Sequence, residues 1–223
     1  MPIELNEKLG SHEQIRNFYD RIGSLLDTQR FFKAPALNAL LKYSEFENAR
    51  SVFELGCGTG RLAEKILLRN NELIYHGTDL SSTMVRLARN RLERFGSRAT
   101  VLLSDSTAGI PLPDGAADRF VSSYVFDLMS ASEIMSLLDE AHRVLGAKGR
   151  LCLVSLTNSN QWFGRVLTSM WSRLHQINPM LMGGCRPIKL TEFIDPTRWR
   201  VRHVSRAARF GLTSEVLIAE KTG

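Results

Sequence analysis

The spacing of apolar residues along the chain switches repeatedly between the period of a helix and the short runs typical of buried strands. Short apolar runs predict strands over residues 52–55, 73–78, 99–104, 118–123 and 150–156. Apolar residues at helical spacing predict helices between these strands, over residues 61–68, 82–95 and 131–145. Strands that alternate with helices predict an α/β fold built on a mostly parallel sheet.

Two further helices are predicted before the first strand. One amphipathic face is formed by Ile15, Phe18, Tyr19, Ile22, Leu25 and Leu26. The second helix is predicted to begin near Pro35, because a proline suits the first turn, where no backbone N–H is needed. These helices occupy residues 1–48, and the core that follows occupies residues 49–156.

The last third of the chain is predicted to hold an insertion and a hairpin. Residues 157–197 are too long for a simple connection, and their apolar helical stripe includes Trp162, Phe163, Met170 and Trp171. Two strands close the chain within residues 198–223, at 199–206 and 214–219. Arginines that alternate with apolar residues in the first of them are typical of an edge strand that avoids pairing with other chains. The whole chain, 1–223, is predicted to form a single domain.

Composition narrows the class of protein. Of the 223 residues, 43% are hydrophobic and 23% are charged, which is ordinary for a globular domain. The net charge of +6 is mild and no run of five like charges occurs, so we expect no nucleic-acid partner. Three widely spaced cysteines without a CxxC pair predict neither a metal site nor a disulfide framework, and favour a reducing cytoplasm. We expect neither a signal peptide nor a membrane-spanning helix.

The strongest chemical signal is Glu54-Leu55-Gly56-Cys57-Gly58-Thr59-Gly60, which joins the first predicted strand to a helix. Glycines let backbone approach a ligand closely, as in nucleotide-binding βαβ units. A carboxylate at the end of a buried strand is costly unless something pairs with it. A dinucleotide-binding loop of the Gly-x-Gly-x-x-Gly type needs its third glycine at position 61, where this chain has Arg61.

This motif resembles the first motif of the class I S-adenosylmethionine-dependent methyltransferases. The resemblance implies a Rossmann-like sheet of seven mostly parallel strands, with an antiparallel C-terminal β-hairpin and an N-terminal helical lid. It also implies S-adenosylmethionine as cofactor and S-adenosylhomocysteine as product. In that family the glycine loop lies under the cofactor, and the acidic residue, here Glu54, helps to position the methionine amino group. Tyr19 would close over the methionine end, or would simply pack its helix.

Carboxylates after the next two strands match the same resemblance. Asp79 lies 19 residues past Gly60, where a carboxylate can accept hydrogen bonds from both ribose hydroxyls; the alternative is a helix cap, a role that Ser81 can fill instead. Met84 would lie against the adenine, or in the core. Asp105 would accept from the adenine amino group. Further positions that the resemblance assigns to the cofactor site are Cys57, Leu80, Ser106 and Ser122.

The catalytic groups are less well marked. The exit of the fourth strand faces the transferring methyl group in this family, so Tyr124 and Asp127 are candidates, each of which could equally be structural. His175 and His12 are further candidates for a base. Methyl transfer depends mainly on alignment of donor and acceptor. The segment Ser122-Ser123-Tyr124-Val125 departs from the Asn/Asp-Pro-Pro-aromatic motif of DNA and protein amino-group methyltransferases.

The expected function is methyl transfer to an O, N or C atom of a small, partly apolar acceptor, such as a quinone-like, polyketide-like or lipid compound. The apolar stripe within residues 157–197 motivates this expectation. A protein or RNA methyltransferase and a non-catalytic S-adenosylmethionine-binding partner protein stay open as alternatives. Peripheral membrane contact is compatible with the same stripe, and the protein is expected to be a monomer or a homodimer.

Overall fold

The computed structural model describes residues 11–23, 30–104, 109–158, 185–209 and 211–222. Its centre is a seven-stranded sheet with the order β3-β2-β1-β4-β5-β7-β6. The strands are β1 (Ser51–Leu55), β2 (Ile74–Asp79), β3 (Ala99–Leu103), β4 (Ala117–Ser123), β5 (Leu145–Thr157), β6 (Trp199–Arg209) and β7 (Leu212–Lys221). The first five strands are parallel, and β7 inserts antiparallel between β5 and β6. The predicted fold class is therefore confirmed.

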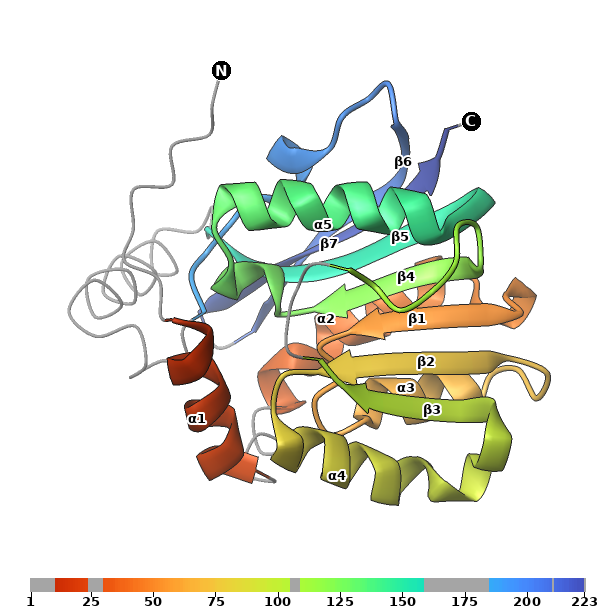
Figure 1. Cartoon of the computed structure of the whole chain (residues 1–223). Coiled ribbons are helices and arrows are strands. Elements are labelled where there is room, and N and C mark those ends of the chain that lie inside the picture. The colour runs from red at the N-terminus through yellow and green to blue at the C-terminus, as the bar shows by residue number, and fades with distance from the viewer. Residues whose placement is uncertain (1–10, 24–29, 105–108, 159–184, 210, 223) are drawn as a thin grey trace.

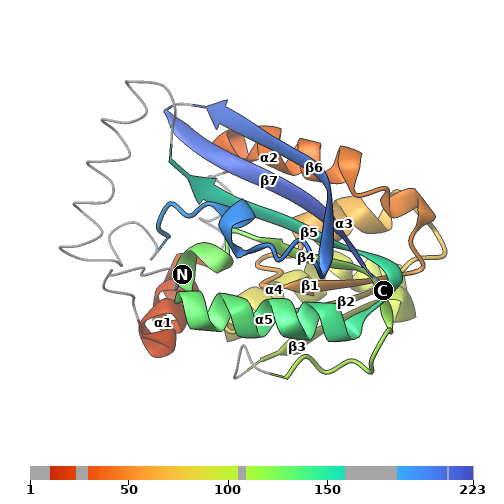
Figure 2. The same cartoon turned by 90° about the horizontal axis from the view of Figure 1, so that it is seen from above.

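Helices cover both faces of the sheet. The helices α2 (Arg30–Tyr43), α3 (Arg61–Leu67) and α4 (Ser82–Leu92) pack on one face, and α5 (Ala131–Val144) packs on the other. Figure 2 shows α2 and α5 on opposite sides of the strands. Short 3-10 helices lie at Phe46–Asn48, Glu93–Arg98, Phe126–Leu128 and Leu190–Phe193.

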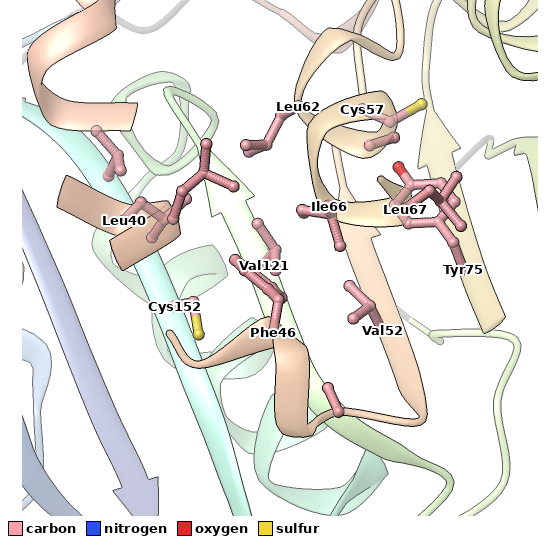
Figure 3. Packing of buried hydrophobic residues seen from close by; sticks show 14 of the residues in the cluster. Leu40, Phe46, Val52, Cys57, Leu62, Ile66, Leu67, Tyr75, Val121 and Cys152 are labelled. Carbon is pink, nitrogen blue, oxygen red and sulfur yellow. The ribbon is translucent and has the colours of Figure 1, made fainter. Parts of the chain in front are cut away.

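Successive side chains of each strand point to opposite faces of the sheet, so the hydrophobic core is divided into two clusters. In β1, Val52 joins the cluster under α2 and α3, whereas Phe53 joins the cluster under α5. In β4, Val121 and Phe120 divide in the same way. Figure 3 shows part of the first cluster, where Leu40 of α2 and Ile66 of α3 lie over Val52 and Val121 of the sheet. The carboxyl ends of the parallel strands are thus held between two packed layers.

Two elements begin well before their predicted starts. Helix α2 begins at Arg30, so Pro35 lies inside the helix and not in its first turn. The helix continues through the proline although one backbone bond is lost, because Ala36, Leu40 and Leu41 are buried against the sheet. Strand β5 begins at Leu145 and not at Arg150, because Leu145 already pairs with Ala117 before an irregularity in the ladder.

The N-terminal helix α1 (His12–Ile22) lies beyond the carboxyl ends of the parallel strands (Figure 1). A capping box between Ser11 and Gln14 begins it, and Gly23 follows its last residue. The apolar pattern predicted a helix that continued to Leu26, but residues 24–29 are outside the described ranges. Helix α1 therefore lies at the end of the sheet where the predicted N-terminal lid would lie.

Strand β6 forms one edge of the sheet, as its arginines predicted. Arg202 pairs with Glu220 at 2.7 Å on the neighbouring strand, and Arg198 pairs with Asp139 of α5. Within the described ranges no helix has both the length and the apolar character needed to cross a bilayer.

Candidate functional site

A pocket opens where the carboxyl ends of β1, β2 and β4 meet helices α1 and α2. Its empty space of about 1200 Å³ includes the part open to solvent. One side is lined by Glu54, the glycine loop 56–60, Asp79, Leu80, Ser81, Met84 and Ser104. Another is lined by Leu37, Tyr124, Val125, Leu128 and Met129, and α1 contributes Ile15, Arg16 and Tyr19. The pocket therefore has a polar end and an apolar end.

The loop needs glycine at its three glycine positions for different physical reasons. Gly56, Gly58 and Gly60 all have positive φ angles, of 71°, 53° and 75°. A Cβ at Gly56 would lie 2.3 Å from Val125, and a Cβ at Gly60 would lie 3.1 Å from the backbone of Ala88 in α4. A Cβ at Gly58 would meet no described atom within 4 Å, although Gly58 lines the pocket. Gly58 thus presents bare backbone to the pocket.

Glu54 is the buried acid of the site, with 1% of its surface exposed. Its Oε2 accepts a hydrogen bond of 2.6 Å from the hydroxyl of Tyr75 in β2. Burial raises the pKa of Glu54 to about 8, although the bond from Tyr75 acts in the opposite direction. The carboxyl group of Glu54 therefore keeps its proton to a higher pH than an ordinary glutamic acid does.

Gly77 makes room for the ring of Tyr75. It pairs directly with Glu54 across the ladder, and a Cβ on it would lie 2.5 Å from the Tyr75 hydroxyl. The sequence contained one signal for this contact, since glycine inside a strand often marks a close approach. No sequence pattern marks Tyr75 as the partner of Glu54, because a tyrosine in a buried strand is expected to pack in the hydrophobic core.

Asp79 ends β2 and braces the glycine loop. Its Oδ2 accepts from the N–H of Gly58 at 2.8 Å, and its Oδ1 accepts from the N–H of Ser81 at 2.9 Å. The predicted cap of α4 is confirmed to be Ser81, whose hydroxyl accepts from the N–H of Met84 at 3.1 Å. Each carboxylate oxygen of Asp79 has a second lone pair that can accept from a ligand. Burial raises the pKa of Asp79.

Arginines of α4 and of the turn that follows it bond to neighbouring segments. Arg91 donates to the carbonyl of Thr59 at 2.5 Å and to its hydroxyl at 2.7 Å, and Arg89 donates to the carbonyl of Val101. Arg91 therefore anchors the glycine loop at Thr59, a role that residue spacing alone does not predict.

Helix α1 is attached to the pocket through Asp20. Its Oδ1 accepts from the hydroxyl of Ser81 at 2.5 Å and from the N–H of Thr83 at 3.1 Å. Tyr19, the neighbour of Asp20, lines the pocket. Burial raises the pKa of Tyr19 well above its ordinary value. The sequence pointed to Tyr19 but not to the bonds of Asp20.

Tyr124 directly follows β4 and lines the pocket with strained backbone, since its φ is 58°. Its hydroxyl lies 2.8 Å from that of Ser214, and burial raises its pKa. A neutral, hydrogen-bonded hydroxyl is a poor base. Tyr124 therefore serves as a wall of the pocket in this geometry.

Asp127 does not line the pocket. It is fully buried, and its carboxylate accepts from the hydroxyl of Ser155 and, at 2.8 Å, from the N–H of Leu156. Burial raises its pKa to about 7. These bonds join the turn after β4 to β5, which is the structural alternative that the sequence left open.

Five other expected residues lie away from the pocket or outside the described ranges. The side chain of Ser122 is turned away from the pocket and bonds the carbonyl of Leu55 at 3.3 Å; Ser123 lines the pocket instead, because neighbours in a strand face opposite sides. His12 is exposed and lies 2.8 Å from Glu133 of α5, so it connects two helices. Asp105, Ser106 and His175 fall in the segments that the structure does not describe, as does the apolar stripe.

Lys33 is one of the pocket residues that the sequence did not mark. It lies near the start of α2 and lines the pocket, with its ammonium nitrogen 4.7 Å from the centre of the Tyr124 ring. Nothing in the helical pattern distinguishes it from a surface lysine. Among the described residues, no cluster of three metal-binding side chains occurs.

Comparison with known proteins identifies the domain. Residues 52–149 match the family model of the methyltransferase domain. The chain is 26% identical over 162 residues to the tRNA N(3)-methylcytidine methyltransferase Mettl2 of Drosophila melanogaster, which covers 67% of this chain and 50% of that protein. It is 27% identical over 159 residues to a demethylmenaquinone methyltransferase of Tropheryma whipplei, which covers 69% and 64%. The matches thus span about half to two thirds of these relatives.

Solved structures agree on the fold. The [4+2]-cyclase SpnF aligns with a TM-score of 0.73 and 14% identity over 96% of this chain and 98% of its own. The magnesium protoporphyrin IX methyltransferase of Synechocystis aligns with a TM-score of 0.70 and 13% identity over 96% and 100%. The chain therefore contains a methyltransferase domain at residues 52–149, and as a whole it has the fold of these solved structures.

Proposed function

We propose that the chain binds S-adenosylmethionine in this pocket and transfers its methyl group to a small, partly apolar acceptor. The observation that carries the proposal is the continuity of the pocket, which joins the carboxylates beside the glycine loop to the apolar wall of Leu37, Val125, Leu128 and Met129. The first end suits a nucleoside with a charged amino-acid tail. The second suits an acceptor with an apolar part.

The residues of the polar end fit this cofactor. Gly58 offers backbone that no described side chain covers. The hydroxyl of Thr78 is buried in the pocket wall and forms no hydrogen bond with a described residue, so a ligand can satisfy it. The second lone pairs of Asp79 suit the two ribose hydroxyls, and the buried Glu54 suits the cationic amino group. Met84 and Leu80 supply apolar contacts for the adenine.

When bound, S-adenosylmethionine supplies a methyl group on a positively charged sulfur. The residues of this chain bind, orient and exclude water. Asp79 and Arg91 both hold the glycine loop, through Gly58 and Thr59. Helix α1, held by Asp20, covers the opening, and the apolar wall keeps water from the acceptor. Alignment of this kind supplies most of the acceleration that a methyl transfer needs.

The relatives support a small acceptor without defining it. One is a demethylmenaquinone methyltransferase, whose name indicates a quinone-like acceptor, in accord with the apolar wall. The other is a tRNA methyltransferase, so RNA is the second candidate acceptor. The mild net charge and the apolar wall favour the small acceptor.

Calorimetric titration tests the cofactor part of this proposal. We expect S-adenosylmethionine and S-adenosylhomocysteine to bind and NAD not to bind. Asp79→Asn should weaken binding about tenfold or more, because hydrogen bonds to a charged group contribute about 1.5–3 kcal/mol each. Asp114→Asn, which changes an exposed carboxylate paired with Arg143, is the matched control and should bind normally. Binding of NAD in preference to S-adenosylmethionine would contradict the proposal.

A further inference from the structure

Helix α1 crosses the opening of the pocket and is attached near each of its ends. Near its start, Nε2 of His12 lies 2.8 Å from Oε1 of Glu133 in α5. Near its end, Asp20 accepts a hydrogen bond from the hydroxyl of Ser81, the cap of α4. Because α4 and α5 pack on opposite faces of the sheet, the helix spans the carboxyl ends of the strands that lie between them (Figure 1).

Arg16 lies midway between these two attachments and lines the pocket. Residues four apart are neighbours on the surface of a helix, so Arg16 lies on the same side of α1 as His12 and Asp20. The middle one of the five parallel strands is β1, whose end carries Glu54. A side chain from the middle of α1 is therefore placed to reach the part of the pocket beside Glu54.

Arg16 differs from the other cations of the pocket. The pocket is lined by three cationic side chains, those of Arg16, Lys33 and Arg61. Lys33 and Arg61 each already have an interaction partner. Arg16 forms no hydrogen bond or ion pair with a residue in the described ranges, and the carboxylate of Asp20, one turn further along α1, acts with it through charge. The guanidinium of Arg16 is thus open to a ligand.

We propose that Arg16 binds the carboxylate of S-adenosylmethionine, so that α1 selects ligands with an intact amino-acid tail. The planar fork of a guanidinium donates two parallel hydrogen bonds to a carboxylate. The amino group and the carboxylate of an amino acid are attached to one carbon atom, so the carboxylate must lie close to the amino group for which Glu54 is suited. This inference rests on the proposed function and assigns the second charged group of the cofactor tail.

The same contact connects the ligand to the helix over the pocket. A carboxylate held by Arg16 gives α1 a third attachment, between those at His12 and Asp20. S-adenosylmethionine and S-adenosylhomocysteine both carry this carboxylate, so the contact persists before and after methyl transfer. Decarboxylated S-adenosylmethionine keeps the nucleoside, the sulfonium and the amino group but lacks the carboxylate. The expected selectivity is therefore for the complete tail.

Calorimetric titration with S-adenosylmethionine and with its decarboxylated form tests the inference. We expect the wild type to bind the decarboxylated ligand at least tenfold more weakly. Arg16→Met should weaken binding of S-adenosylmethionine at least tenfold and should change the affinity for the decarboxylated ligand less than twofold. Arg16→Lys should keep part of the affinity for S-adenosylmethionine, because an ammonium group retains the charge without the fork.

Arg21→Met is the matched control, because Arg21 is exposed in the last turn of the same helix and outside the pocket lining. It should bind both ligands like the wild type. Equal affinity of the wild type for the two ligands, equal losses of both in Arg16→Met, or unchanged binding of S-adenosylmethionine by Arg16→Met would each overturn the inference and leave the proposed function in place. Absence of binding of both ligands by the wild type would contradict the proposed function, and the inference with it. The wild-type comparison needs no variant, so it decides even if Arg16→Met does not fold.

Discussion

The hydroxyl of Tyr75 donates a 2.6 Å hydrogen bond to Glu54, and both side chains are almost fully buried. The two residues lie on neighbouring parallel strands, and Gly77 provides the space that the tyrosine ring occupies. The acid of the first motif is therefore held by a small arrangement of three residues, two of which belong to β2.

Tyr75→Phe should lower the free energy of unfolding by about 1–3 kcal/mol, because it leaves the buried Glu54 without this partner. Chemical denaturation measures the change. Tyr43→Phe is the control, since Tyr43 is partly exposed, and it should change stability by less than about 0.5 kcal/mol. Equal stability of Tyr75→Phe and the wild type would show that the hydrogen bond contributes nothing.

Gly77→Ala should destabilise the protein by about 1–3 kcal/mol through overpacking against the Tyr75 ring. In the double variant with Tyr75→Phe the loss should be smaller than the sum of the single losses, because the phenylalanine lacks the closest clashing atom. Additive losses would indicate that the two residues do not share this space.

Glu54 should make stability and cofactor binding depend on pH. Its folded pKa of about 8 exceeds its ordinary value of 4.5, so the folded state holds a proton that the unfolded chain releases. Stability from this group is therefore greatest at low pH and falls as pH rises from about 4.5 to about 8. Glu54→Gln should flatten the stability profile over that range, measured by denaturation at several pH values.

The same carboxyl group should release a proton when the cofactor binds at pH 7. The cationic amino group of S-adenosylmethionine favours the ionised form of Glu54 and so lowers its pKa. Calorimetry in buffers with different ionisation enthalpies measures the number of protons released. Proton release by the wild type that persists unchanged in Glu54→Gln would assign it to another group.

Arg91→Met should weaken S-adenosylmethionine binding about tenfold, which corresponds to about 1.4 kcal/mol, because the glycine loop loses its bonds at Thr59. The control is Arg94→Met, which removes an exposed ion pair with Glu64 and a contact with the Phe95 ring, and should leave affinity unchanged. If both variants bind equally well, the loop does not depend on Arg91.

Asp20→Ala should speed cofactor release several-fold, because helix α1 loses its bonds to Ser81 and Thr83. Stopped-flow displacement measures the rate. Glu13→Ala, exposed on the same helix, should release the cofactor at the wild-type rate. An unchanged rate for Asp20→Ala would mean that α1 does not act as a lid.

The sequence predicted the fold well because the sheet depends on local patterns. The glycine loop, the cap at Ser81 and the capping box at Ser130 all have short-range signatures, and the structure contains each of them. Element boundaries were less predictable where tertiary packing overrides propensity, as at Pro35 inside α2.

The site was predicted only where its residues follow strands. Asp79 and Glu54 lie at strand ends, so their positions at the pocket followed from topology. Lys33 lines the pocket from a helix. Asp20 and Arg91 lie on helices and bond Ser81 and Thr59, which line the pocket. The partners of these three residues lie on other elements, so no local pattern marks them. Ser123 lines the pocket where Ser122 was predicted to do so. The difference depends on which face of β4 meets the pocket, and only the packed structure determines that face.

The most direct test of the proposed activity follows the methyl group itself. The protein is incubated with cell extract and S-adenosylmethionine that carries a labelled methyl group, and the products are separated into RNA, protein and molecules extracted by organic solvent. We predict that the label enters small, solvent-extractable molecules with the wild type and not with Asp79→Asn. Label in RNA or protein, or no transfer by a chain that binds the cofactor, would contradict the account.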